Sequence, residues 1–192
     1  MSAPQPTALA EALRNAHAAL RAGRAVSAER GLRALAVQFP GDVNCLWLLG
    51  AALLDQDKLA ESIATLEGVL GGAADFANAR VDLARAYRRS GQAARARAEV
   101  RRVLEKLPHH PLAWLAYADV LVDLEQYADA RVAFERARLC DPQRRQVEQA
   151  TAALVADERE SSERLFRDIL QVNPSHVAAL CGLAALSLAA DK

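Results

Sequence analysis

Histidines are the side chains in this 192-residue chain best suited to general acid-base chemistry or metal binding near neutral pH. The chain has four of them: His17, His109, His110 and His176. No serine or cysteine nucleophile and no acid are arranged around any of them in a recognisable catalytic motif. We therefore predict that the histidines are solvated or take part in packing, and that the chain has no catalytic residue.

Thiols and glycine-rich loops are the other groups that could carry chemistry. Cys45, Cys140 and Cys181 lie far apart and lack the CxxC or Cys/His spacing of a disulfide framework or a zinc site, so we expect buried thiols. The single glycine pair, Gly71-Gly72, has no following lysine, so it does not predict a phosphate-binding loop. The sequence thus predicts no metal, no cofactor and no enzymatic activity for these residues.

Charge and hydropathy limit the partners. Lysines and arginines number 24, as do aspartates and glutamates, so the net charge gives no long-range attraction to nucleic acid or to an anionic membrane. The dibasic pairs Arg101-Arg102 and Arg144-Arg145 have no aromatic residues interleaved with them, so we predict no nucleic-acid binding. The longest apolar run, Cys45 to Leu54, is about half as long as a membrane span, and no membrane contact is expected.

The N-terminal segment suggests where the protein works. Met1 to Thr7 is polar and contains proline, and no apolar core with a cleavage site follows it. We therefore expect no secretory signal and a cytoplasmic location.

The elements that hold these residues are predicted to be helices. Alanine, leucine, arginine and glutamate dominate, and aromatic residues make up only 5% of the chain, which favours an all-α fold. Prolines at 40, 108, 142 and 174 are 68, 34 and 32 residues apart, which reveals an internal repeat. The predicted units span residues 9–42, 43–76, 77–110, 111–142 and 143–176, and a terminal helix spans 177–190.

Each unit reads as a helix, a turn and a second helix that ends near the proline, because proline cannot continue a helix. The turns are predicted at Gly23, Asp57, Gly91, Glu125 and Asp157, of which only the glycines are strong helix breakers.

Small and large apolar residues recur at fixed places in the units. Small residues on both helices allow close approach within a hairpin, and larger ones fill the gap to the next hairpin. The small set is Ala16, Gly50, Ala84, Ala118 and Ala150 on the first helices and Ala28, Ser62, Ala96 and Ala130 on the second. The large set is Leu32, Leu66, Val100, Phe134 and Phe166.

These positions resemble the tetratricopeptide repeat. Its pattern is matched best by the unit that starts at Pro111, through Trp114, Tyr117, Ala118, Leu121, Ala130, Phe134, Ala137 and Pro142. The resemblance covers nearly the whole chain. It implies a right-handed α-solenoid of about five helical hairpins plus one C-terminal helix, forming a single array over residues 1–192. It also implies a non-catalytic scaffold that binds a protein or peptide in a concave groove.

The resemblance further implies that six positions of each first helix point into the groove. Residues so placed include Leu48, Leu54, Val81, Leu112, Leu115, Ala116, Val122, Val147, Glu148, Thr151 and Val155. The predicted peptide-binding set is Asn44, Asn78, Asp82, Arg85, Arg89, Asp119 and Asp123. The two asparagines hold the same position in successive units, and their amides can donate to and accept from a peptide backbone.

Two features of the groove, its charged residues and Trp47, leave alternatives open. Arg85, Arg88 and Arg89 face Asp119 and Asp123 of the next unit, so these charges either contact a partner or pair with one another. Trp47 either lies exposed in the groove or turns into the hairpin core.

The C-terminal helix is apolar on nearly all sides. Because a terminal helix of a solenoid needs a polar outer face, we expect the 192 residues to be a fragment of a longer protein, cut within the first helix of a sixth repeat. The alternatives are that residues 177–190 form a natural apolar capping helix, or that they pair with a second copy as a homodimer. The run from Leu165 to Leu188 is also similar to the repeat region of bacterial tetratricopeptide-linked sulfotransferases. That similarity implies an alternative role as the substrate-recruiting or dimerising arm of a longer enzyme.

Overall fold

The computed structural model describes residues 6–141, 143–174 and 176–190, which form eleven α-helices and no strand. The predicted all-α fold is confirmed. The repeat landmark Pro142 and residues 1–5 of the N-terminal segment lie outside the described residues. In chain order the helices are α1 (Pro6–Arg21), α2 (Ala25–Gln38), α3 (Val43–Asp55), α4 (Leu59–Gly72), α5 (Ala77–Arg89), α6 (Ala93–Lys106), α7 (Pro111–Asp123), α8 (Tyr127–Cys140), α9 (Arg144–Val155), α10 (Arg159–Val172) and α11 (Val177–Ala190).

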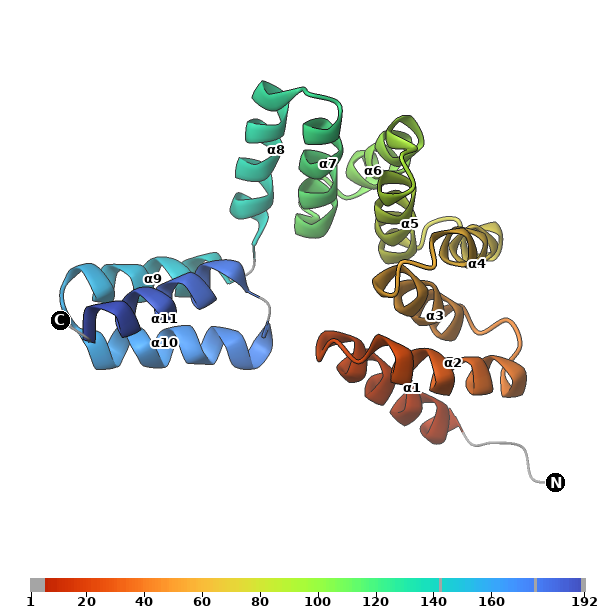
Figure 1. The fold of residues 1–192 in the computed structure, drawn as a ribbon, viewed down its shortest axis with the longest axis horizontal. Helices are drawn as coiled ribbons and strands as arrows, with labels where there is room; N and C mark the ends of the chain where they lie inside the picture. Colours follow the sequence, from red (N-terminus) through yellow and green to blue (C-terminus); the bar gives the residue numbers. More distant parts are fainter. Residues whose placement is uncertain (1–5, 142, 175, 191–192) are drawn as a thin grey trace. The chain divides into compact units, whose positions relative to one another are not determined.

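The helices pack as hairpins within two compact units, Met1–Ala137 and Arg138–Lys192 (Figure 1). In the first unit α1 packs on α2, α3 on α4 and α5 on α6, and each second helix also contacts the following first helix as far as α7. In the second unit α10 packs on both α9 and α11. The continuous array over residues 1–192 stays a prediction.

The turns inside the hairpins lie where the spacing placed them. Gly23 (φ 71°), Asp57 (62°), Gly91 (78°), Glu125 (59°) and Asp157 (61°) all have left-handed backbone conformations. Only glycine adopts this region without steric cost, so the three acidic residues are held there by the helices on either side. Hairpin geometry therefore prevails over local preference at these three turns.

Close approach inside a hairpin depends on the small residues. A Cβ atom added to Gly50 would lie 2.7 Å from Cγ and Cδ2 of Leu66, whose side chain is fully buried. The Ser62 hydroxyl donates a hydrogen bond of 2.8 Å to the Gly50 carbonyl, and Ser162 donates one of the same length to Ala150. The same small-residue contact thus recurs in both units.

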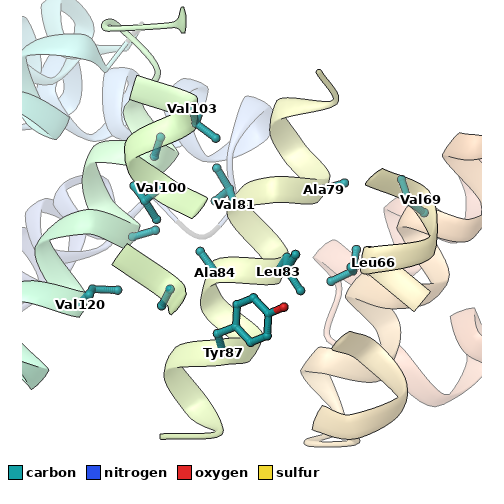
Figure 2. Packing of buried hydrophobic residues seen from close by; sticks show 13 residues of the cluster. Leu66, Val69, Ala79, Val81, Leu83, Ala84, Tyr87, Val100, Val103 and Val120 are labelled. Carbon is teal, nitrogen blue, oxygen red and sulfur yellow. The ribbon is translucent and has the colours of Figure 1, made fainter. Parts of the chain in front are cut away.

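The largest core cluster lies around α5 (Figure 2). Ala79 and Leu83 point toward α4, whereas Val81 and Ala84 lie on the side of α6. Most of the predicted gap-filling residues are buried, namely Leu32, Leu66, Val100 and Phe166. Phe134 differs, because it lies in α8 and is 40% exposed.

Candidate interaction surface

The first helices of successive hairpins lie next to one another in the first unit. α5 contacts α3 on one side and α7 on the other. Since all three are first helices, their outward side chains share one side of the unit, which we call the first-helix face. We define it by these predicted groove positions: Asn44, Trp47, Asp55, Asn78, Asp82, Arg85, Arg88, Arg89, Leu112, Leu115, Asp119, Val122 and Asp123.

Some of the residues predicted to line the groove are buried in the core instead. Leu48, Leu54, Val81 and Ala116 are between 1% and 5% exposed, so their prediction as groove residues was wrong. Neighbouring helices cover these positions, because the apolar stripe of each first helix is wider than the pattern allowed for.

Two free amides stand at the start of α3 and α5. Asn44 and Asn78 are exposed, and within residues 6–141 neither side chain makes a hydrogen bond. Each lies second in its helix, so the two amides occupy equivalent positions on neighbouring helices. They are available to donate to, and accept from, an extended backbone.

Trp47 connects the helices α3 and α5. Its ring packs edge-on against Phe76 with the centroids 5.2 Å apart, and its Nε1 donates a 2.8 Å hydrogen bond to Asp82. Asp82 also accepts from Arg85 at 3.1 Å, and its side chain is only 14% exposed. Burial raises the pKa of Asp82, whereas the Arg85 charge and the Trp47 hydrogen bond lower it. Asp82 therefore fixes the position of α3 against α5.

The last two arginines of α5, Arg88 and Arg89, contact opposite neighbours. Arg89 donates to the Leu54 carbonyl at 2.6 Å and pairs with Asp57 at 2.9 Å, both in the preceding hairpin. Arg88 lies 3.4 Å from Asp123 and 3.9 Å from Asp119 of α7, so of the two alternatives for these charges this arginine takes the internal pairing.

Electrostatics at the α5–α7 junction depend mainly on Arg88. Burial is the largest influence on Asp119 and raises its pKa; the charge of Arg88 lowers it, the Asp123 charge raises it, and Arg85 lowers it to a smaller extent. Sequence reasoning left Arg88 out of the predicted binding set. Its spacing from Asp119 and Asp123, close to one repeat length, was the signal that could have included it.

Apolar side chains also lie on the first helices. Leu112, Leu115 and Val122 of α7 are 57%, 44% and 39% exposed. In the second unit an open pocket of about 580 Å³ lies along one side of α9. It is lined by Arg138, Val147, Glu148, Thr151, Ala152, Val155 and Ala156, four of which belong to the predicted groove positions.

The histidines and cysteines, for which we predicted no chemical role, mostly take part in helix capping and packing. The Nδ1 atoms of His110 and His176 accept hydrogen bonds of 3.2 and 3.3 Å from backbone N–H groups three residues ahead, which caps α7 and α11. Burial lowers the pKa of His110, in keeping with its neutral, accepting form. Cys45 is buried as expected. Cys181 is exposed, against the expectation, because it lies on a side of α11 that the neighbouring helices of the second unit do not cover.

The residues that the structure describes contain no group of three or more His, Cys, Asp or Glu side chains placed to hold a metal ion. No helix among them is both long enough and apolar enough to cross a membrane.

Comparison with known proteins assigns the family. A family model described as tetratricopeptide repeat matches residues 53–107 and 89–154, and another with the same description matches residues 13–78. The chain belongs to the tetratricopeptide repeat family. Membership makes it a helical-repeat scaffold of the kind that contacts other proteins, and such scaffolds are in general non-catalytic.

Several solved structures share the tetratricopeptide fold. A thermophilic tetratricopeptide repeat protein of Thermus thermophilus has a TM-score of 0.66 and 15% identity over 93% of this chain and 98% of that chain. A fragment of MamA from Desulfovibrio magneticus has a TM-score of 0.57 and 19% identity over 88% of this chain and 97% of that chain. A tetratricopeptide repeat protein of Parabacteroides merdae has a TM-score of 0.53 and 22% identity over 93% of this chain and 72% of that chain.

At these identities the likeness shows the fold alone. Among curated proteins, none matches this chain. The similarity to tetratricopeptide-linked sulfotransferases stays a prediction.

Proposed function

We propose that this tetratricopeptide protein is a scaffold that binds a segment of another polypeptide on the first-helix face. The observation that carries the proposal is the pair of unpartnered amides, Asn44 and Asn78, at equivalent places on neighbouring helices. Amides in register can guide an extended backbone without reading its sequence, and adjacent side chains can then select for side-chain type.

The rest of the face supports this role. Leu112 and Leu115 offer apolar contact area beside the amides, and exposed apolar groups on a polar surface are typical of interaction sites. The Trp47–Asp82 hydrogen bond holds α3 and α5 together before any partner arrives, which lowers the entropic cost of binding.

Peptide selection tests the proposal. Random 12-residue peptides displayed on phage are selected on the full chain, and the affinity of the recovered peptides is measured by fluorescence polarisation. We expect Asn78→Ala and Leu115→Glu each to weaken binding by about tenfold, as loss of an interface anchor does. Glu105→Gln, an exposed change on the second helix α6, should have no effect. Peptides that bind equally well to both face variants would refute the proposal.

Self-association is a second candidate function, favoured by the exposed side of α11. Val177 and Leu188 are 71% exposed and Leu180 is 47% exposed, although Leu186 is buried. Light scattering of the full chain, with and without Leu180→Glu, tests this candidate. A homodimer that becomes a monomer in the variant would support pairing through α11, and a monomer in both cases would reject it.

The remaining predictions concern context. Work as the arm of a longer enzyme such as a sulfotransferase stays an alternative to the scaffold role. We keep a cytoplasmic location and a bacterial origin as proposals.

A further inference from the structure

We propose that the segment bound at the α5–α7 part of the first-helix face carries a lysine or arginine next to a large apolar residue. This inference rests on the proposed function and adds the chemistry of the partner. It follows from the distribution of charge between α5 and α7 and from the apolar side chains that flank it.

Carboxylates outnumber cations at this place. Asp119 and Asp123 share one arginine, Arg88, at 3.9 and 3.4 Å. The other three arginines of α5 have their ion pairs elsewhere: Arg80 with Glu99, Arg85 with Asp82 and Arg89 with Asp57. In the described part of the chain no second cation lies within ion-pair distance of Asp119 or Asp123. The site therefore holds a surplus negative charge that an incoming cation can neutralise.

Both carboxylates can be reached from solvent. The Asp119 and Asp123 side chains are 39% and 38% exposed, whereas the Arg88 side chain between them is 30% exposed. Partial burial makes the ionised form of Asp119 less favourable, and this cost falls when a second cation arrives. A basic side chain thus gains a charge-assisted hydrogen bond without displacing Arg88.

The flanking residues define the rest of the ligand. Leu115 lies one turn before Asp119 and Val122 almost one turn after it, so all three share one side of α7. The methylene stem of a lysine or arginine can lie along these exposed apolar groups while its charged end reaches the carboxylates. Leu112 and Leu115 then accept a neighbouring apolar side chain of the segment.

An acidic segment is disfavoured by the same geometry. It would need a free cation, but Arg88 is already shared by two carboxylates, and Arg89 is held by the Leu54 carbonyl and Asp57. Repulsion by the surplus carboxylate therefore adds selectivity against acidic partners.

The experiment compares two peptide selections. The phage library is selected in parallel on the full chain and on the variant that combines Asp119→Asn with Asp123→Asn. We expect lysine or arginine beside Leu, Ile, Phe or Met to be enriched severalfold on the unmodified chain, and the basic residue not to be enriched on the variant. Circular dichroism confirms that the variant is folded.

A double-mutant cycle then locates the contact. Replacing the basic residue of a recovered peptide with glutamine should weaken binding to the unmodified chain by about tenfold, the loss expected for a hydrogen bond between charged groups, and should change binding to the double variant little. Arg88→Gln, which frees both carboxylates, should tighten binding of the same peptide. Glu105→Gln on α6 removes a charge away from this face and serves as the control.

The outcomes separate this inference from the proposed function. Recovered peptides that depend on Asn78 and Leu115 but show no enrichment of basic residues would overturn the inference and leave the scaffold role in place. Peptides that ignore the first-helix face altogether would overturn both. Basic peptides that bind the double variant as tightly as the unmodified chain would also overturn the inference.

Discussion

Glu29 joins the first two hairpins and should make their stability depend on pH. Its buried carboxylate accepts hydrogen bonds from Lys58 at 2.7 Å, from Arg33 at 2.9 Å and from Gln56 at 2.7 Å. Lys58 and Gln56 lie in the connection between α3 and α4, whereas Arg33 lies in α2 with Glu29. These donors, with Lys58 the largest influence, lower the pKa of Glu29 from 4.5 to about 2.

The size and sign of the effect follow from proton linkage. The pKa difference between the folded and unfolded states corresponds to at most about 3.5 kcal/mol, at about 1.4 kcal/mol per pKa unit. The Lys58 and Arg33 side chains are 41% and 50% exposed, so solvent screening reduces this to about 1–2 kcal/mol. Because the folded pKa is lowered, the stabilisation is complete above about pH 4.5 and is lost as the pH falls toward about 2.

Urea unfolding of the full chain and of Glu29→Gln, followed by far-UV circular dichroism, measures this contribution. At about pH 7 the variant should be less stable by about 1–2 kcal/mol, and at about pH 3 the difference should fall to roughly half. Glu105→Gln, an exposed glutamate on α6, is the matched control and should change little. Equal stability of the variant and the unmodified chain at pH 7, or a difference of the same size at both pH values, would refute this reasoning.

Three further substitutions or probes test the packing. Glu125→Gly should stabilise the protein by about 0.5–1 kcal/mol in thermal unfolding, since φ is 59° at Glu125 and glycine relieves that strain; a loss of stability would contradict it. Gly50→Val should cost about 1–3 kcal/mol in urea unfolding, because even a Cβ meets Leu66 at 2.7 Å; a cost near zero would mean that the hairpin opens freely. A thiol reagent should label Cys181 in the native protein within minutes and Cys45, which is buried with a raised pKa, only on unfolding; equal labelling rates would contradict the assigned burial.

The repeat spacing carried most of the information about the fold. Asp57, Glu125 and Asp157 are not glycines, yet their distance from Gly23 and Gly91 placed them in turns, and the structure shows that these turns have a left-handed backbone. Local turn propensity alone would have missed these three turns, because it depends only on a residue and its immediate neighbours in the sequence. A hairpin repeated in register imposes the same backbone on equivalent positions, so the sequence periodicity was sufficient to predict where these turns lie.

Burial on the first helices was only partly predictable. The resemblance to the repeat family implied outward positions for Asn44, Asn78, Leu112 and Leu115, and all four are exposed. The same resemblance put Val81 in the groove, although it is 4% exposed. A residue at the border of the apolar stripe is buried or exposed according to a small rotation of its helix against the neighbours. That rotation is set by side chains from other hairpins, which the repeat pattern does not specify.

By itself, the sequence determined the helical hairpins and their turns, since these depend on spacing along one chain. Only the tertiary structure decided how the charges are used. The pattern left open whether the arginines of α5 pair internally; the packing gives Arg89 to the preceding hairpin and Arg88 to Asp119 and Asp123. Long side chains have several partners within reach, and only the three-dimensional distances between helices select among them.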